Sequence, residues 1–230
     1  ELDVILVLRA LDMSLEEIQT FLRNRNPETM QKELIIRRKE VDQKITELEE
    51  HKAVLDRFIS RFEKVQTADF TNMTYSYRSE VYFAVSEEIN EYDETSVFQA
   101  FSRFYPYLDY KDLFSGYPIG YLVEGSAFDQ ESIHEAPYRA LVMIPKERLP
   151  LYSDQAIICR PAGNYVSGFV RGEIHHLKDF TKRFKAYLES ANLQIDGDIW
   201  ELMWQDDVST DQKEQQIFEV MLPVKERIPS

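Results

Sequence analysis

The stretch Asp198-Ile-Trp-Glu-Leu-Met-Trp-Gln205 decides the fold of this 230-residue chain, because an earlier stretch repeats its pattern. PIGYLVEG, residues 118–125, aligns with it residue by residue. A second pair follows, with YRALVMIPKERLP from Tyr138 matching IFEVMLPVKERIP from Ile217. Short runs of alternating large side chains are typical of strands. We therefore predict a duplicated β-α-β-β unit whose halves are related by a pseudo-twofold axis, with helices on one side and a concave face on the other.

The remaining elements of both halves follow from the same periodicities. Aromatic residues at helical spacing predict a helix in each half, and alternation predicts the strands. The first half is expected to contain a strand at 78–86, a helix at 95–108 and strands at 118–124 and 138–144. The second is expected to contain a strand at 165–172, a helix at 176–190 and strands at 198–204 and 216–222. The predicted class is α+β, with one domain over residues 68–230 and halves of about 75–150 and 151–230.

Composition indicates a folded chain with an acidic body. Hydrophobic residues make up 43% and charged residues 30%, and the net charge is −14. The first 66 residues are nearly neutral, so the acidity belongs to the later part, which would repel nucleic acid. The single Cys159 excludes an internal disulfide and fits a reducing compartment. No apolar run reaches the length of a membrane span, so we expect a cytoplasmic protein.

The first third of the chain is predicted to be helical. Residues 4–11 form a short apolar run, and Ser14 with Glu17 fits a capping box at the start of a second helix. Asn26-Pro27 breaks that helix, and no Gly or further Pro follows until about Gln66. Forty helical residues would extend roughly 60 Å.

Apolar residues recur along this long helix every seventh position. A second core position, four residues later, alternates between apolar residues and the basic Arg38 and Lys52. Such heptads predict a coiled coil, because a helix this long cannot bury its seam on a small domain. The alternative is a single helix lying across its own domain. The predicted dimerisation residues are Leu34, Val41, Ile45, Leu48, Leu55, Ile59 and Phe62.

LRALDMSLEEIQTFL, residues 8–22, followed by a Pro-started heptad helix, resembles the MerR family of bacterial transcription regulators. The resemblance covers roughly residues 2–65 and implies an antiparallel homodimer, with residues 1–26 as the remnant of a helical head and 27–67 as the dimerisation helix. Two departures stand out. The helix-turn-helix and first wing are missing, and Asp12 replaces the usual Gly. The chain also begins at Glu1 without an initiator Met, so we expect an upstream portion that would supply the promoter contacts.

The order of elements after Tyr75, and the Ile-x-Glu-Leu strand that contains Glu201, resemble the GyrI-like effector-binding domain over about residues 75–229. Both resemblances in one chain imply an effector-sensing regulator that binds lipophilic cationic or aromatic small molecules. In that family the second-half Glu lies at the floor of an aromatic cavity. Carried over, Glu201 is the charge partner of the effector and Tyr121, its repeat equivalent, is the opposite wall.

The residues around Glu201 support this assignment independently. A carboxylate among aromatic rings is poorly solvated, so its pKa should rise, and an entering cation would restore the lost interaction. Ring faces also attract cations without demanding one shape, which predicts binding of many ligands. The alternative is that Glu201 caps an exposed strand face or pairs with a nearby Arg.

The other candidate wall residues are less specific, because most buried rings belong to the core. Tyr82 is preferred to Phe83, which with Val81 and Val85 is expected in the core under a helix. Trp200 and Trp204 share the side opposite Glu201 and are expected to pack against helix 176–190. The remaining candidates are Tyr138, Tyr165, Phe169, Met203 and Phe218.

Other chemistries find little support in the sequence. His175 and His176 point in different directions and have no third ligand at a useful spacing. No serine lies in a nucleophile elbow, no Gly-rich phosphate loop is present, and no cofactor is expected. Two alternatives remain open: a GyrI-like small-molecule hydrolase, or a passive drug-sequestering protein. An enzyme is not expected, because a stand-alone hydrolase would not need a 40-residue dimerisation helix.

Overall fold

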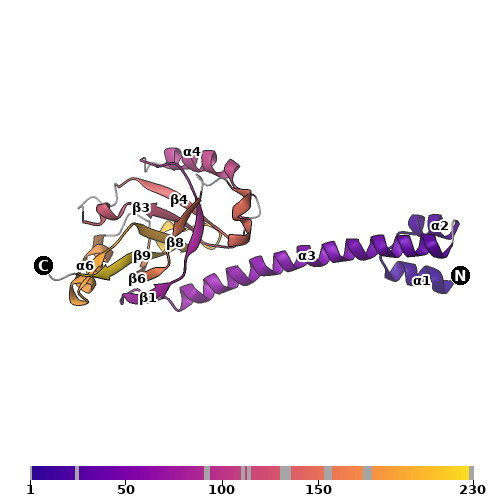
Figure 1. Ribbon diagram of the computed structural model, residues 1–230, viewed down its shortest axis with the longest axis horizontal. Helices are drawn as coiled ribbons and strands as arrows, with labels where there is room; N and C mark the ends of the chain where they lie inside the picture. The colour runs from indigo at the N-terminus through magenta and orange to yellow at the C-terminus, as the bar shows by residue number, and fades with distance from the viewer. Residues whose placement is uncertain are drawn as a thin grey trace. The chain divides into compact units, whose positions relative to one another are not determined.

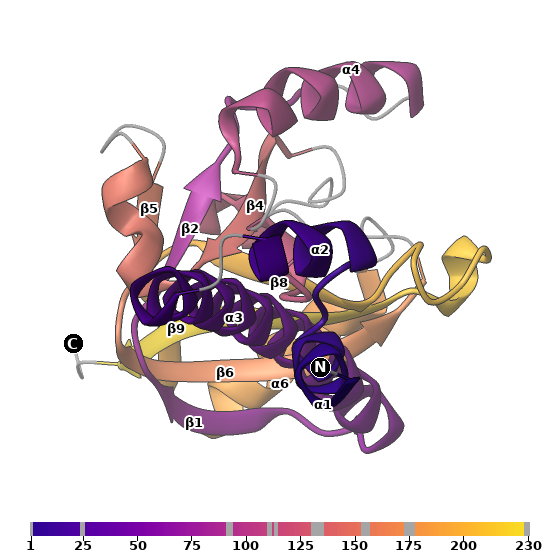
Figure 2. The ribbon, with the colours of Figure 1, turned by 90° about the vertical axis from the view of Figure 1, so that its right-hand side faces the viewer.

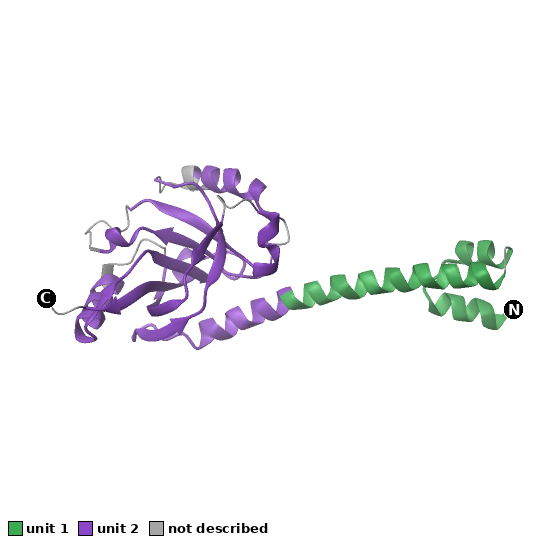
Figure 3. Ribbon diagram, viewed as in Figure 1, with its two compact units in different colours: residues 1–53 green, residues 54–230 purple. Residues whose placement is uncertain are grey.

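The computed structural model describes residues 2–23, 26–90, 94–109, 112, 115–129, 136–152, 157–172 and 178–227. It divides into two compact units, residues 1–53 and 54–230 (Figure 3). The long helix α3 runs through this division, so its last residues belong to the second unit. The expected boundaries near residues 26 and 67 follow secondary structure rather than compactness and stay predictions.

The first unit consists of helices α1 (Leu2–Ala10), α2 (Leu15–Arg23) and the first part of α3 (Pro27–Gln66). The predicted capping box opens α2. The backbone N–H of Ser14 donates to Glu17 Oε2 at 2.7 Å, and the N–H of Glu17 donates to Ser14 Oγ at 3.2 Å. These bonds satisfy N–H groups that the helix cannot pair internally.

Helix α3 begins and ends where the sequence predicts. Asn26 Oδ1 accepts a hydrogen bond from the N–H of Thr29 at 2.8 Å, and Pro27 occupies the first turn, where its missing N–H costs nothing. A small apolar cluster of Leu8, Met13, Ile18 and Phe21 holds α1 and α2 together and packs against Met30 of α3.

The second unit is built on one antiparallel sheet, which confirms the α+β class (Figure 1). Its strand order is β1-β6-β9-β8-β3-β4-β2-β5, and β7 pairs with β9. Figure 2 shows β6 running between β1 and β9. The strands are β1 (Thr74–Arg78), β2 (Val81–Val85), β3 (Ile119–Val123), β4 (Tyr138–Ile144), β5 (Ile157–Arg160), β6 (Gly163–Arg171), β7 (Leu193–Ile195), β8 (Ile199–Gln205) and β9 (Ile217–Glu226), and the helices are α4 (Glu94–Phe104) and α6 (Lys178–Ser190).

The sheet has the same order on both sides of its central pair, β3 and β8. Outward from β3 lie β4 and β2, and outward from β8 lie β9 and β6. Tyr121 pairs directly with Glu201, and these are the residues that the two repeats align. A duplicated β-α-β-β unit would give this arrangement, although the duplication itself stays a prediction.

The two faces of the sheet carry separate cores. The face covered by α4 and α6 packs residues such as Phe104, Phe180 and Phe184 against Val142, Val220 and Leu222. The opposite face holds Phe83, Val85, Leu141, Tyr165, Trp200, Leu202 and Met221, with Val81 and Trp204 packed against them.

The expectation that Phe83 packs under the helix of its half, and that the tryptophans pack against α6, is therefore wrong. Alternation along a strand fixes which residues share a side, but not which side a helix covers.

Along the part of the chain that the structure describes, no helix combines the length and apolar character needed to cross a membrane.

Candidate functional site

Glu201 lies in the middle of β8, at the centre of the sheet. In register it pairs with Tyr121 on β3 and with Val220 on β9. Val220 belongs to the core under α4 and α6, so Glu201 points into that core rather than to solvent. The residue is 1% exposed, which is very unusual for a glutamate.

The carboxylate of Glu201 is poorly compensated. Its Oε2 has no hydrogen-bond partner among the described residues. Removal from water disfavours the charged form, and this burial raises the pKa of Glu201 to about 8. The orphaned oxygen argues against the alternative that Glu201 caps an exposed strand or is neutralised by an Arg.

Aromatic rings form the immediate surroundings of Glu201. The ring centroid of its partner Tyr121 lies 5.5 Å from that of Tyr138, 6.3 Å from Phe101 of α4 and 6.4 Å from Phe218 of β9. Burial raises the pKa of the Tyr121 hydroxyl, so it stays protonated. The site is a carboxyl group enclosed by neutral rings, whose edges and faces lie close to the carboxyl group.

A second buried glutamate provides a contrast on the neighbouring strand. Glu219 of β9 is 2% exposed but faces the opposite core. Its Oε1 accepts from Arg78 at 2.8 Å, and its Oε2 accepts from Lys64 at 2.5 Å and from Trp204 Nε1 at 3.0 Å. Burial alone therefore does not distinguish Glu201; its missing partner does.

The structure brings together only part of the predicted site. Tyr121, Tyr138, Met203 and Phe218 share the face of Glu201. Tyr121 is in register with Glu201, and Met203 is two residues from Glu201 on the same strand. Phe218 and Tyr138 are two residues from Val220 and Ala140, which lie in the same row across the sheet. The pairing in β3, β4, β8 and β9 thus makes one aromatic patch at the centre of the sheet.

Tyr165 and Phe169 do not join this patch, and the expectation that they line one cavity with Glu201 is corrected by the register. Tyr165 is fully buried in the core of Trp200, and Phe169 pairs with Glu219. They do share a side, as alternation requires, but it is the opposite one.

Tyr82 is half-buried on β2, which β4 separates from the central strand β3. It pairs with Ile144, which belongs to the core under α4 and α6. However, its hydroxyl donates to Glu80 at 3.2 Å and its ring lies 5.8 Å from Lys146 Nζ. Its position at the site stays a prediction.

Sequence reasoning missed two kinds of site residue. Phe101 and Tyr105, recognised only as the apolar face of a helix, pack against the Tyr121 side of the sheet. Gly120 allows β3 to approach β8, because a Cβ at that position would lie 2.3 Å from the carbonyl oxygen of Glu201. The glycine within an otherwise bulky strand was the available signal for such a close approach.

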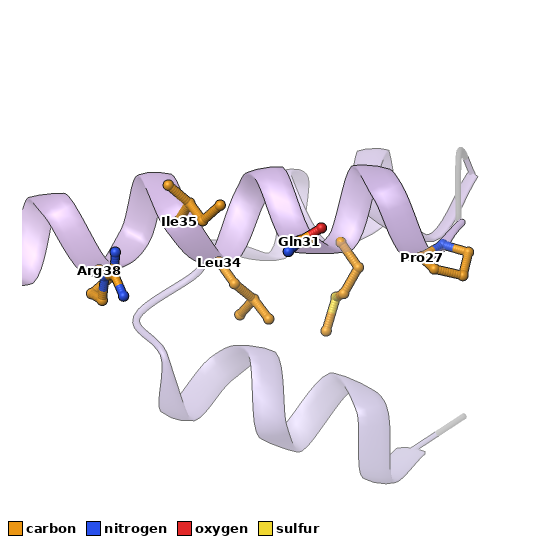
Figure 4. A pocket seen from close by; sticks show the side chains of 6 residues that line it. Pro27, Gln31, Leu34, Ile35 and Arg38 are labelled. Atoms are coloured by element: carbon orange, nitrogen blue, oxygen red, sulfur yellow. The ribbon is translucent and has the colours of Figure 1, made fainter.

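A separate hollow lies at the start of α3. It has a volume of about 410 Å³ and is lined by Pro27, Met30, Gln31, Leu34, Ile35 and Arg38 (Figure 4). Figure 4 shows Leu34 and Ile35 leaving the helix in different directions. Leu34 also opens the heptad stripe. Across the seven predicted dimerisation residues, exposure runs from 38% to 66%, so the seam is open in the single chain.

His175 and His176 lie outside the described residues. Among those that the structure describes, no group of three or more His, Cys, Asp or Glu side chains could hold a metal ion.

Comparison with known proteins gives a family match for the N-terminal segment. Residues 1–58 match the family model described as MerR, DNA binding. The multidrug-efflux transporter 2 regulator of Bacillus subtilis (strain 168) is 23% identical over 224 residues, which cover 97% of this chain and 79% of that protein. The first 58 residues are therefore similar to the DNA-binding segment of the MerR family.

The family model is described by DNA binding and the relative is named as a regulator, whereas the sheet around Glu201 lies outside the residues that the family model matches. Among solved structures, a hydrolase from Listeria innocua matches with a TM-score of 0.51 and 11% identity, over 72% of this chain and 97% of that one. This likeness shows the fold alone. EcmrR in complex with DNA matches at a TM-score of 0.47 and 13% identity, over 97% of this chain and 81% of that one.

Proposed function

We propose that this chain is a MerR-family, multidrug-type sensor whose second unit binds lipophilic cations at Glu201. The observation that carries the proposal is the buried carboxyl group with an orphaned oxygen, on a residue that pairs in register with Tyr121. A buried acid without a partner costs stability, so its presence at the centre of the domain favours a binding role over a structural one.

A lipophilic cation fits this site for two physical reasons. Its charge compensates the ionised carboxylate in a medium where electrostatic interactions are strong. Its apolar surface can pack on Tyr121, Tyr138 and Phe218, and each cation–ring contact contributes about 0.5–2 kcal/mol. Neither interaction demands one ligand shape. Because Glu201 is almost fully enclosed, a ligand reaches it only when neighbouring side chains move aside.

The relative in Bacillus subtilis supports this choice of effector, since it is named as the regulator of a multidrug-efflux transporter.

We further propose that two chains pair through the open heptad seam of α3 in antiparallel orientation. In this proposal the second unit does not contact promoter DNA, because its acidity does not suit nucleic acid.

Calorimetric titration with tetraphenylphosphonium at pH 8.5 tests the effector site. Glu201→Gln keeps the shape of the protonated side chain but cannot ionise, so we expect its affinity for the cation to fall by at least about tenfold, which one lost charge contact can account for. The neutral triphenylphosphine oxide should bind both proteins alike. Glu124→Gln, at an exposed glutamate directly after β3, is the matched control and should bind like the wild type.

Equal affinity of the wild type and Glu201→Gln for the cation would remove Glu201 from the site. The hydrolase alternative gives a different result, because a carboxylate in a dry pocket can also act as a general base. Turnover of an activated ester that is lost in Glu201→Gln would favour that second function over sensing.

A further inference from the structure

The last turns of α3 carry a basic stripe that faces the sheet. Arg57, Arg61 and Lys64 are spaced at i, i+4 and i+7, so they share one face of the helix. All three lie in the same compact unit as the sheet (Figure 3). We call these three residues the basic clamp.

Arg61 holds the end of β8. It is 5% exposed, and its Nη2 donates to Asp206 Oδ2 at 2.7 Å and to the carbonyl of Met203 at 3.3 Å. Its Nε donates to the carbonyl of Trp204 at 3.3 Å. The register between β8 and β9 shifts between Met203 and Gln205, so Trp204 is the extra residue of a bulge. Arg61 therefore grips strand backbone at a break in the ladder, two residues beyond Glu201.

Arg57 holds the approach to β3. Its Nε donates to the carbonyl of Ser115, and its guanidinium lies 4.7 Å from the centroid of the Tyr117 ring. Because β3 and β8 are antiparallel, the start of β3 lies beside the end of β8. The two arginines thus hold adjacent ends of the two strands that present Tyr121 and Glu201.

Lys64 extends the contact to β9. Its Nζ bonds to Glu219 at 2.5 Å and lies 3.6 Å from the centroid of the Trp204 ring. Glu219 also forms an ion pair with Arg78 of β1, so this ion-pair cluster links the helix to the edge strand β1. The clamp consequently contacts β8, β9 and the segment before β3 from one rigid element.

We propose that the basic clamp is the coupling element that converts ligand entry beside Glu201 into a movement of α3. The inference rests on the proposed function. Tyr121 and Glu201 are direct cross-strand partners, so a ligand inserted between their side chains must change how β3 and β8 lie against each other. Arg57 and Arg61 are about 6 Å apart along the helix, close to the spacing of about 4.8 Å between neighbouring strands. A helix cannot stretch, so a shift of one strand end turns or tilts it.

Hydrogen exchange of backbone amides at residues 57–66, with and without saturating tetraphenylphosphonium, measures this coupling in the whole chain. In the wild type we expect ligand to change the exchange rates by about fivefold, the lower end of typical coupling between sites. Arg61→Met combined with Asp206→Asn removes both charges of the buried pair together. This double variant should bind the cation with unchanged affinity but lose the response in α3. Lys39→Met, at an exposed lysine of the same helix outside the two heptad core positions, is the matched control and should respond like the wild type.

A double variant that binds the cation normally and still shows the full response at residues 57–66 would overturn the inference. If the double variant fails to fold, Arg61→Lys replaces it, because a single ammonium cannot reproduce the fork of bonds to two carbonyls and a carboxylate. A full response in Arg61→Lys would equally overturn the inference. Failure of the proposed function appears separately, as equal cation binding by Glu201→Gln, and would overturn both proposals.

Discussion

At the scale of single residues, two buried glutamates on neighbouring strands have opposite roles. Glu219 receives hydrogen bonds from Lys64, Arg78 and Trp204, so its charge is compensated where it lies. Glu201 has an oxygen without any described partner. On one face of the sheet the glutamate is paired with positive charges, and on the other face an ionised glutamate would lack a positive partner.

Replacing Glu201 with Gln should change how stability depends on pH. The pKa of Glu201 is raised to about 8 in the folded chain, so between its ordinary value of 4.5 and 8 the folded state holds a proton that the unfolded state releases. Wild-type stability from this group is present at low pH, falls as pH rises through this window and is constant above it. Glu201→Gln should match the wild type near pH 4 and be more stable at pH 9, by a few kcal/mol.

Urea unfolding of both proteins from pH 4 to pH 9 measures this difference. The same series on Glu124→Gln should show no such divergence. Curves for Glu201→Gln and the wild type that stay parallel over the whole range would contradict the raised pKa.

The burial and raised pKa of Glu201 could be predicted from the sequence, whereas some of the side chains that surround it could not. A carboxylate flanked by Trp200 and Leu202 implies burial, and burial implies a raised pKa. Tyr165 and Phe169 lie on the face opposite to the predicted one, because local alternation contains no information about which face α4 and α6 cover. Phe101 was missed as a site residue because its helical spacing is equally typical of ordinary core packing.

At the scale of elements, the close pairing of β3 with β8 determines the site. Gly120→Ala should weaken this pairing, because the new Cβ would lie 2.3 Å from a backbone oxygen that cannot move aside alone. We expect a loss of about 1–3 kcal/mol in the free energy of unfolding, as for other overpacked sites, together with weaker cation binding.

Thermal unfolding and calorimetry of Gly120→Ala check both effects. Gly163→Ala is the control, since nothing lies within 4 Å of a Cβ built at that position. If both variants unfold and bind alike, close approach at Gly120 has no special role.

The helices show why some elements are easy to predict. The limits of α3 were predicted correctly because Asn26 and Pro27 begin it with strong local signals and no helix breaker follows. The capping box of Ser14 and Glu17 was found for the same reason. The basic clamp was not predicted, since the partners of Arg61 are 142 or more residues away in sequence.

At the scale of the whole molecule, the open seam of α3 is the feature to test. Leu48 and Leu55 are 66% and 62% exposed in the single chain, and apolar residues at heptad spacing are expected to be covered by a second helix. The double variant Leu48→Glu/Leu55→Glu should therefore be monomeric at concentrations where the wild type has twice the mass of one chain.

Light scattering combined with size exclusion measures these masses. Val208→Glu, at a position that is 76% exposed outside the helix, should keep the mass of the wild type. A wild-type chain that is monomeric at micromolar concentration would contradict the paired-helix proposal.

The palindromic order of the strands has one more consequence, which concerns why its central residue pair is unlike. If the two halves were identical in sequence, the axis would set two carboxylates, or two phenols, against each other. Two acids in contact would share one proton and repel, and two phenols would offer a guest no charge. Only the mixed pair of Tyr121 and Glu201 gives a single anion facing a flat neutral surface, so the proposed recognition would depend on the place where the predicted symmetry is broken.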